Sequence, residues 1–162
     1  MAVAQVYCLD TSSAIEWFVR TYPPSILPNL PERMEALIDA GRLRAPKAVL
    51  DEISRIDDDC CKWAKAQTEL FIEESIAVQR IVRALMAQYP APVKKKKKPT
   101  GINGADPFVI ALAKDGGAHW AVVSDEHPGS DENKKIPYVC KAEKVRCITF
   151  QRMMIEEGWQ FR

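Results

Sequence analysis

The chain has 162 residues, of which 47% are hydrophobic and 28% are charged, and its formal net charge is +1. This length and composition are typical of one ordinary globular domain with a real core, so we expect a single domain over residues 1–162. No apolar run approaches the roughly 18 residues that a membrane-spanning helix needs, so we expect no membrane-spanning helix and no membrane partner. The net charge excludes a whole-molecule attraction to nucleic acid, so any such attraction must come from a local patch.

The cysteines and the first residues bear on the cellular compartment. Five cysteines are an odd number at scattered positions, which predicts neither a disulfide framework nor a C-x-x-C metal site and is typical of a reducing cytoplasm. The start "MAVAQVYCLD" lacks a basic region ahead of its apolar residues, so we expect no signal peptide. The sequence therefore favours a cytoplasmic location.

Strand and helix patterns alternate along the chain. Its first half predicts a strand at 3–9, helices at 13–20 and 32–41, a short extended piece at 42–46, and helices at 46–56, 58–74 and 75–89. Its second half predicts a loop at 90–104, a helix at 105–117, a strand within 120–126, a loop at 126–135, a strand at 145–150 and a helix at 150–158. Strands separated by helices predict an α/β fold with a parallel sheet, whose ligands bind outside the carboxyl ends of the strands.

Asp10 directly follows the first predicted strand, "VYCL". Ser13 and Glu16 have the spacing of a capping box, so we expect them to open the next helix and to leave Asp10 without a capping role. An acid after a buried strand is costly unless it is paired or binds a cation. We therefore interpret Asp10 as a functional residue, with a simple helix cap as the alternative.

Glu52 is judged by helical geometry. Residues three and four apart share a helix face, and Val49, Ile53 and Ile56 form an apolar stripe within which Glu52 lies. Asp51 falls on a charged, solvated face. The pattern predicts that Glu52 points inward and Asp51 outward; the alternative is that Glu52 reaches water at the edge of the stripe.

Asp106 begins the apolar segment "DPFVIALA". Aspartate is a favoured N-cap and Pro107 a favoured first helical residue, so a structural role alone explains the pair. The helix is apolar nearly all round, which predicts burial and places Asp106 inside the molecule. A capping carboxylate can still bind a cation through its second oxygen, so both roles stay open.

Asp125 and Glu126 follow "VVS" at the end of a predicted strand. We expect one of them to be a fourth inward acid and the other a loop residue, and Ser124 can position its neighbour by hydrogen bonding. The alternative is an acidic loop with no role in a site.

A run of five lysines occupies the predicted loop before Asp106: Lys94, Lys95, Lys96, Lys97 and Lys98. Such a run is typical of a solvated loop. Because it precedes the Asp106 segment, the second interpretation is that it binds substrate phosphates, an attraction that ignores base sequence and weakens with salt.

Four segments together resemble, in order and spacing, the acidic motifs of the PIN-like nuclease superfamily: "VYCLDTSSAI", "PKAVLDEI", "NGADPFVIALA" and "VVSDE". The wording "INGADPFVIALA" is similar to that of a prokaryotic branch of PIN-like proteins. The resemblance covers most of the chain, and the last two motifs are its most specific part. It implies a three-layer α/β/α PIN-like fold with a central parallel sheet.

The resemblance also implies a set of site residues. The metal-binding, catalytic acids of the family fall on Asp10, Glu52, Asp106 and the "SDE" segment. The fourth acid of many relatives lies two positions after a Ser or Thr, which selects Glu126, although the usual aspartate is replaced there and Asp125 remains a candidate ligand. Thr11 and Ser124 match the hydroxyl residues that support the pocket in relatives.

The acids themselves indicate the chemistry. Crowded carboxylates repel one another unless a counter-charge is present, and their oxygens suit Mg²⁺ or Mn²⁺, which also bind phosphates. One or two such ions can activate water for phosphodiester hydrolysis. The acids thus indicate metal-dependent hydrolysis of a phosphodiester, and the resemblance to PIN-like nucleases implies that the protein is an endoribonuclease acting on RNA.

Several interpretations of the function stay open. Small family members are commonly toxins paired with an antitoxin protein and often dimerise, which implies a toxin role, a cognate antitoxin and a homodimer. The main alternative is a catalytically inactive PIN-like module that binds RNA or protein. An aspartyl phosphatase is disfavoured, because Ser12 stands where its second aspartate would be.

Overall fold

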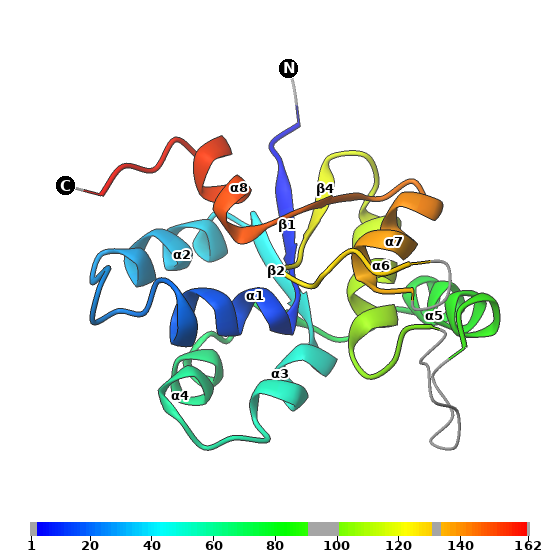
Figure 1. Ribbon diagram of the computed structural model, residues 1–162, viewed down its shortest axis with the longest axis horizontal. Coiled ribbons are helices and arrows are strands. Elements are labelled where there is room, and N and C mark those ends of the chain that lie inside the picture. The colour runs from blue at the N-terminus through cyan, green and yellow to red at the C-terminus, as the bar shows by residue number, and fades with distance from the viewer. Residues whose placement is uncertain (1–2, 91–100, 131–133, 162) are drawn as a thin grey trace.

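A five-stranded parallel sheet forms the centre of the molecule (Figure 1). The computed structural model describes residues 3–90, 101–130 and 134–161. The strand order is β3-β2-β1-β4-β5. The strands are β1 (Val6–Leu9), β2 (Leu43–Pro46), β3 (Phe71–Ile72), β4 (Trp120–Val123) and β5 (Arg146–Ile148). This confirms the predicted α/β class with a central parallel sheet.

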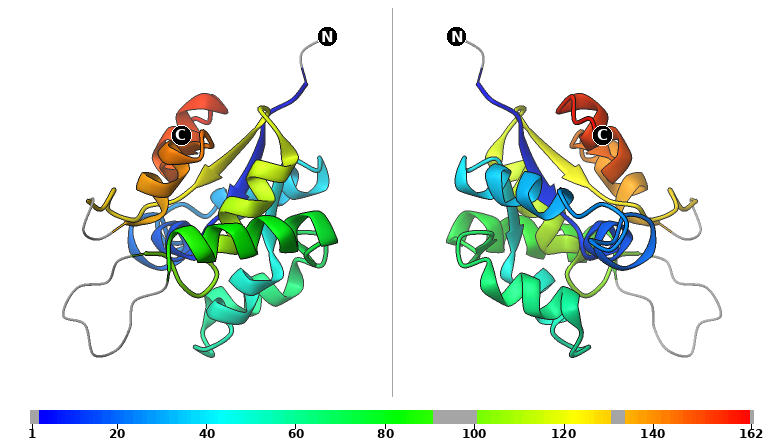
Figure 2. Two further views of the ribbon diagram at one scale, coloured as in Figure 1. Left: turned by 90° about the vertical axis from the view of Figure 1, so that its right-hand side faces the viewer. Right: turned by 90° about the vertical axis from the view of Figure 1, so that its left-hand side faces the viewer.

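Helices cover both faces of this sheet (Figures 1 and 2). The described residues form α1 (Thr11–Ile15), the π-helical turn η1 (Glu16–Arg20), α2 (Leu30–Asp39), α3 (Lys47–Ile53), α4 (Asp59–Ala66), α5 (Ile76–Gln88), α6 (Asp106–Gly116), α7 (Ile136–Ala142) and α8 (Phe150–Glu156). The apolar helix α6 packs against β1, β2 and β4, with α5 packed on α6. On the opposite face the rings of Trp17 and Phe150 stack and join η1 to α8. The predicted three-layer α/β/α arrangement is therefore confirmed.

The register of the two central strands positions the functional edge of the sheet. All four residues of β1 are buried, as expected for a strand covered on both faces. Leu9 pairs with Val123, so β1 and β4 end side by side. The N–H of Asp10 then donates to the carbonyl of Val123 at 2.9 Å. As a result, the residues that follow both strands leave the sheet at one place.

Two elements, β3 and α7, were not predicted from the sequence. Phe71 and Ile72 were expected within a helix at 58–74 but form β3, because this segment pairs with the edge of β2 through Ala45 and Pro46. A two-residue edge strand is too short to show a periodicity of its own. Helix α7 was not expected at all; it forms by burying Ile136, Val139 and Cys140 along one face.

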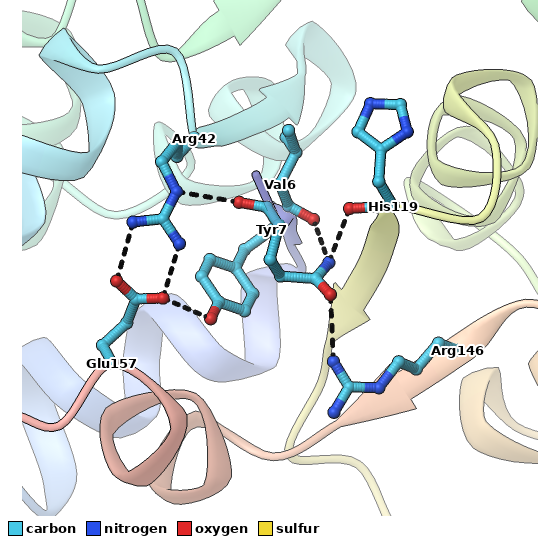
Figure 3. Close-up of polar contacts among 7 residues, drawn as sticks. Val6, Tyr7, Arg42, His119, Arg146 and Glu157 are labelled. Atoms are coloured by element: carbon cyan, nitrogen blue, oxygen red, sulfur yellow. Dashed lines mark hydrogen bonds and ion pairs between the residues drawn. The ribbon is translucent and has the colours of Figure 1, made fainter. Parts of the chain in front are cut away.

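A cluster of polar side chains joins the last helix to the central strands at the end of the sheet where the strands begin, opposite the carboxyl ends (Figure 3). Arg42 holds the Glu157 carboxylate through two hydrogen bonds, of 2.8 and 2.6 Å, and the Tyr7 hydroxyl donates to the same carboxylate at 2.6 Å. The Nε of Arg42 also donates to the carbonyl of Gln5. Glu157 follows α8, so these bonds tie the end of the last helix to β1 and to the residue before β2.

The Glu157 cluster generates a stability prediction. Burial alone would raise the pKa of Glu157, but the hydrogen bonds from Arg42 and Tyr7 and the charge of Arg42 outweigh it and lower the pKa. A lowered folded-state pKa stabilises the protein above the unfolded-state pKa, and this contribution is lost as the pH falls through the folded-state value. We expect Glu157→Gln to lower the free energy of unfolding by about 1–3 kcal/mol at pH 7, measured by urea denaturation, and by much less at pH 3.

Glu156→Gln serves as the matched control, because its partners Arg146 and Arg152 are 40% and 58% exposed. An exposed pair contributes at most about 1 kcal/mol. Equal losses for the two variants at pH 7 would contradict the structural role of Glu157.

Candidate functional site

A cavity of about 290 Å³ brings together four carboxylates from four separate segments. They are Asp10 after β1, Glu52 on α3, Asp106 at the start of α6, and Glu126 after β4. The other lining residues are Thr11, Ser12, Gly101, Asn103 and Lys135. The cavity lies where the carboxyl ends of the strands meet the first turns of α1 and α6. Parallel sheets bind ligands at this edge.

Asp10 is the most buried of the four acids, with 2% of its surface exposed. The hydroxyls of Ser12 and Ser124 donate to its Oδ2 at 2.6 and 3.1 Å. The same oxygen accepts the backbone N–H of Ser12 at 3.4 Å, which makes Asp10 the N-cap of α1. Asp10 therefore has a capping role and also reaches the cavity.

The expected capping box of Ser13 and Glu16 is wrong. Helix α1 begins two residues earlier, at Thr11, so Ser13 lies inside it and Glu16 lies in the π-helical turn. The hydroxyl of Ser13 donates instead to Oδ2 of Asp125 at 2.5 Å. The reason is tertiary, since the end of β4 presents a carboxylate that competes for this hydroxyl.

Glu52 lines the cavity as expected, although part of the argument for it was wrong. Its Oε1 accepts a hydrogen bond from the Thr11 hydroxyl at 2.9 Å, while Asp51 is exposed. Val49 and Ile53 are buried, but α3 ends at Ile53, so Ile56 lies beyond the helix and is 65% exposed. Val49 and Ile53, one turn apart, are therefore sufficient to define the buried face of α3.

A glycine is required opposite Glu52. Gly104 has a positive φ of +57°, a conformation that costs other residues energy. A Cβ atom there would lie 3.0 Å from Oε2 of Glu52. The loop before α6 therefore approaches the carboxylate closely because residue 104 has no side chain.

Asp106 reaches the cavity from a position other than the one expected. The N-cap of α6 is Ala105, and Asp106 is the first residue of the helix, so the prediction that Asp106 caps α6 is wrong. Its Oδ2 accepts the N–H of Asn103 at 3.3 Å, and its own N–H donates to the carbonyl of Asn103. These two bonds close the turn through Gly104 and shift the helix start by one residue.

The structure separates the two acids that follow β4. Glu126 lines the cavity; its Oε2 accepts the N–H of Ile136, and its own N–H donates to Ser124 Oγ, both at 3.3 Å. Asp125 lies outside the lining, because its oxygens accept bonds from Ser13 and from the N–H of Phe150. Of the two candidates for the fourth acid, Glu126 is therefore the carboxylate that lines the cavity, and the assignment of metal ligands stays a prediction.

Burial and like charge dominate the electrostatics of the cavity. Burial is the main cause that raises the pKa of Asp10 to about 6; the hydrogen bonds from Ser12 and Ser124 lower this pKa, and the charge of Glu126 raises it. Burial, followed by the charges of Glu126 and Asp10, raises the pKa of Asp106 to about 8. Both shifts mean that burial, together with neighbouring negative charge, opposes the ionisation of these two acids.

The donor set has the chemistry of a hard-cation site. Carboxylate oxygens are the ligands preferred by Mg²⁺ and Mn²⁺. Within residues 3–90, 101–130 and 134–161, no group of three or more His, Cys, Asp or Glu side chains is already arranged to hold a metal ion. The four acids thus share a cavity without converging on one point.

Several residues of the site escaped the sequence reasoning. Ser12 bonds Asp10 from two positions along the chain, a spacing typical of side chains that form Asx and hydroxyl turns, so a local signal existed. Asn103 and Gly104 are recognisable only once the turn before α6 is known. Lys135 enters the cavity through the start of α7, which the sequence did not predict. The predicted substrate contacts, Lys94 to Lys98, lie outside the described residues.

These features define a class: a three-layer α/β/α protein with an acidic cavity at the carboxyl edge of its parallel sheet. The model of one protein family, described as "Domain of unknown function (DUF4411)", matches residues 7–161. The chain belongs to this family. A comparison with curated proteins finds no match. In the parts of the chain that the structure describes, no helix is long and apolar enough to cross a membrane.

The raised pKa of Asp106 yields a prediction for the metal-free protein. An acid whose folded-state pKa is raised is fully compatible with folding below its unfolded-state value, and stability is lost as the pH rises towards the folded-state value near 8. In EDTA we therefore expect Asp106→Asn to raise the melting temperature at pH 8 and to change it little at pH 4. The effect at pH 8 should be about 1 kcal/mol or more.

Asp115→Asn on the same helix is the control, because Asp115 is exposed and outside the cavity. It should leave the pH dependence of the melting temperature unchanged. A melting temperature of Asp106→Asn that follows wild type at every pH would show that neither burial nor the neighbouring acids raise the pKa of Asp106.

Proposed function

We propose that this protein is a divalent-metal-dependent ribonuclease that hydrolyses phosphodiester bonds in RNA. The observation that carries the proposal is the meeting of Asp10, Glu52, Asp106 and Glu126 in one cavity at the carboxyl edge of the sheet. The choice of RNA is supported by the resemblance of the surrounding motifs to PIN-like nucleases.

The four acids would hold Mg²⁺ or Mn²⁺. When bound, such ions supply an activated water and stabilise the negative charge of the leaving oxygen. The hydrogen bonds that position the acids leave room for this role. In Glu52, Asp106 and Glu126 one oxygen accepts a bond, and the second accepts none within the described residues.

Neutral groups position each acid. Ser12 and Ser124 fix Asp10 through hydroxyls, Thr11 orients Glu52, and the backbone of Ile136 holds Glu126. These donors fix the geometry of the carboxylates and leave their charge in place. The chain's own contribution is therefore four carboxylates that neutral donors hold at the wall of one cavity.

The same resemblance extends the proposal to biological role and partners. It supports a toxin of a toxin–antitoxin pair, a cognate antitoxin protein and a homodimer in the cytoplasm. The competing function is an inactive PIN-like module that binds RNA or protein. The two differ in one measurable property, since only the enzyme turns substrate over.

Cleavage should depend on the metal. We expect the purified protein to cleave RNA in Mg²⁺ or Mn²⁺ and to stop in EDTA, as followed by gel electrophoresis of an end-labelled RNA. Binding of RNA without any cleavage would favour the inactive module. Cleavage that persists in EDTA, with Asp10→Asn excluding contaminating nucleases, would overturn the metal mechanism.

The neighbouring acids of α3 provide a matched pair of variants. Glu52 lines the cavity, whereas Asp51 is exposed on the same helix. We expect Glu52→Gln to lower the rate of RNA cleavage by more than the roughly 10- to 100-fold that loss of an outer-shell partner of a metal site costs, and Asp51→Asn to leave it near wild type. Circular dichroism melting would confirm that both variants fold. Similar rates for the two variants would show that Glu52 is not a ligand.

A further inference from the structure

The acidic cavity also contains a cation to which the proposed function has given no role. Lys135 is the single basic residue among the described residues that line it. It lines the same cavity as four carboxylates, and the pKa values of two of them, Asp10 and Asp106, are raised by burial and by neighbouring negative charge. A lone lysine in such a position has two possible tasks: to neutralise the acids, or to meet an anion that enters.

The backbone of Lys135 is held on both sides. Lys134 pairs with Gly129 in an isolated antiparallel bridge. Ile136, which is fully buried, donates its N–H to Oε2 of Glu126 at 3.3 Å. Lys135 is the N-cap of α7, in extended conformation, between these two anchored neighbours. Its position at the cavity wall beside Glu126 is thus fixed by the fold, while its long side chain remains flexible.

The pairing of charges argues against simple neutralisation. Lys114 shows what a neutralising lysine does in this protein, since its Nζ lies 2.8 Å from Glu143. Lys135 makes no ion pair with any carboxylate of the described residues, although four of them line its cavity. Its charge is therefore available to a ligand.

We propose that Lys135 is a substrate-binding residue that contacts a non-bridging oxygen of the phosphate group entering the cavity. This inference rests on the proposed ribonuclease function. Four carboxylates repel a phosphodiester, and the metal-binding acids cannot attract it themselves. A lysine acts as a point charge on phosphate and needs no fixed geometry to do so. Because the same charge repels cations, Lys135 assists RNA binding and opposes metal binding.

This opposition of effects gives a test that does not depend on turnover. The affinity for a short fluorescein-labelled single-stranded RNA is measured by anisotropy in Ca²⁺, and the affinity for Mn²⁺ alone is measured by calorimetry. We expect Lys135→Ala to weaken RNA binding on the order of 10- to 100-fold, the range for a lost hydrogen bond to a charged group. Its affinity for Mn²⁺ should be equal to wild type or tighter.

Two further variants complete the design. Lys135→Arg keeps the charge and should bind RNA within a few-fold of wild type. Lys134→Ala removes the adjacent charge, which does not line the cavity, and should bind RNA and Mn²⁺ as wild type does. Equal RNA affinities for Lys134→Ala and Lys135→Ala would overturn the proposal. A joint loss of RNA and Mn²⁺ affinity in Lys135→Ala would overturn it too, since it would reveal a structural role.

The outcomes separate this inference from the proposed function. If the wild-type protein cleaves RNA and Lys135→Ala binds RNA normally, only the role of Lys135 is wrong. If the wild-type protein neither binds nor cleaves RNA, the ribonuclease function is wrong and the role of Lys135 is overturned with it.

Discussion

Repulsion among four carboxylates in one cavity is the constraint on which the arrangement of this protein depends. Burial and mutual charge raise the pKa of Asp10 to about 6 and that of Asp106 to about 8. A fold does not gather such groups for its own stability, because each ionised acid opposes the others. The rest of the structure must therefore hold the four carboxylates in place. A bound cation would offset their mutual repulsion.

Two features hold the carboxylates in place: the register of β1 and β4, and a polar cluster at the end of the sheet where the strands begin. Pairing of Leu9 with Val123 aligns the strands whose ends carry Asp10 and Glu126. At the amino-terminal edge, Arg42, Tyr7 and Glu157 join the last helix to the first strand (Figure 3). A stabilising ion pair thus lies at the end of the sheet where the strands begin, and carboxylates that oppose stability lie at the end where they finish. Functional sites commonly reduce stability in this way.

Sequence reasoning found the parts of this design that local patterns encode. The buried runs of β1 and β4 and the apolar helix α6 can be recognised because burial on all sides removes polar residues. The inward face of Glu52 was correct even though Ile56 lies outside the helix, since Val49 and Ile53 alone set the face. By contrast, β3 exists only through its pairing with β2, and no local pattern predicts such a strand.

The errors at the site share one physical cause, competition by partners distant in sequence. Ser13 has the spacing of a cap, but it bonds Asp125, which lies 112 residues away. The same bond removes Asp125 from the cavity and leaves Glu126 as the fourth acid. Lys135 gave no signal in the sequence, because its place depends on the bond between Ile136 and Glu126. The spacing of acids in the sequence identifies candidate site residues, but hydrogen bonds between distant segments determine which of these acids face the cavity.

The choice of hydrogen-bond donors distinguishes structural from functional carboxylates in this chain. Glu157 is held by a guanidinium, which cancels its charge and helps to lower its pKa. The cavity acids are held by hydroxyl and backbone N–H groups, and within the described residues none of them forms an ion pair. Neutral donors fix a carboxylate without consuming its charge, so the negative potential of the cavity stays available to a ligand. A carboxylate in this chain thus has a structural role where it pairs with arginine, and it is a candidate cation ligand where serine or threonine hydroxyls bind it.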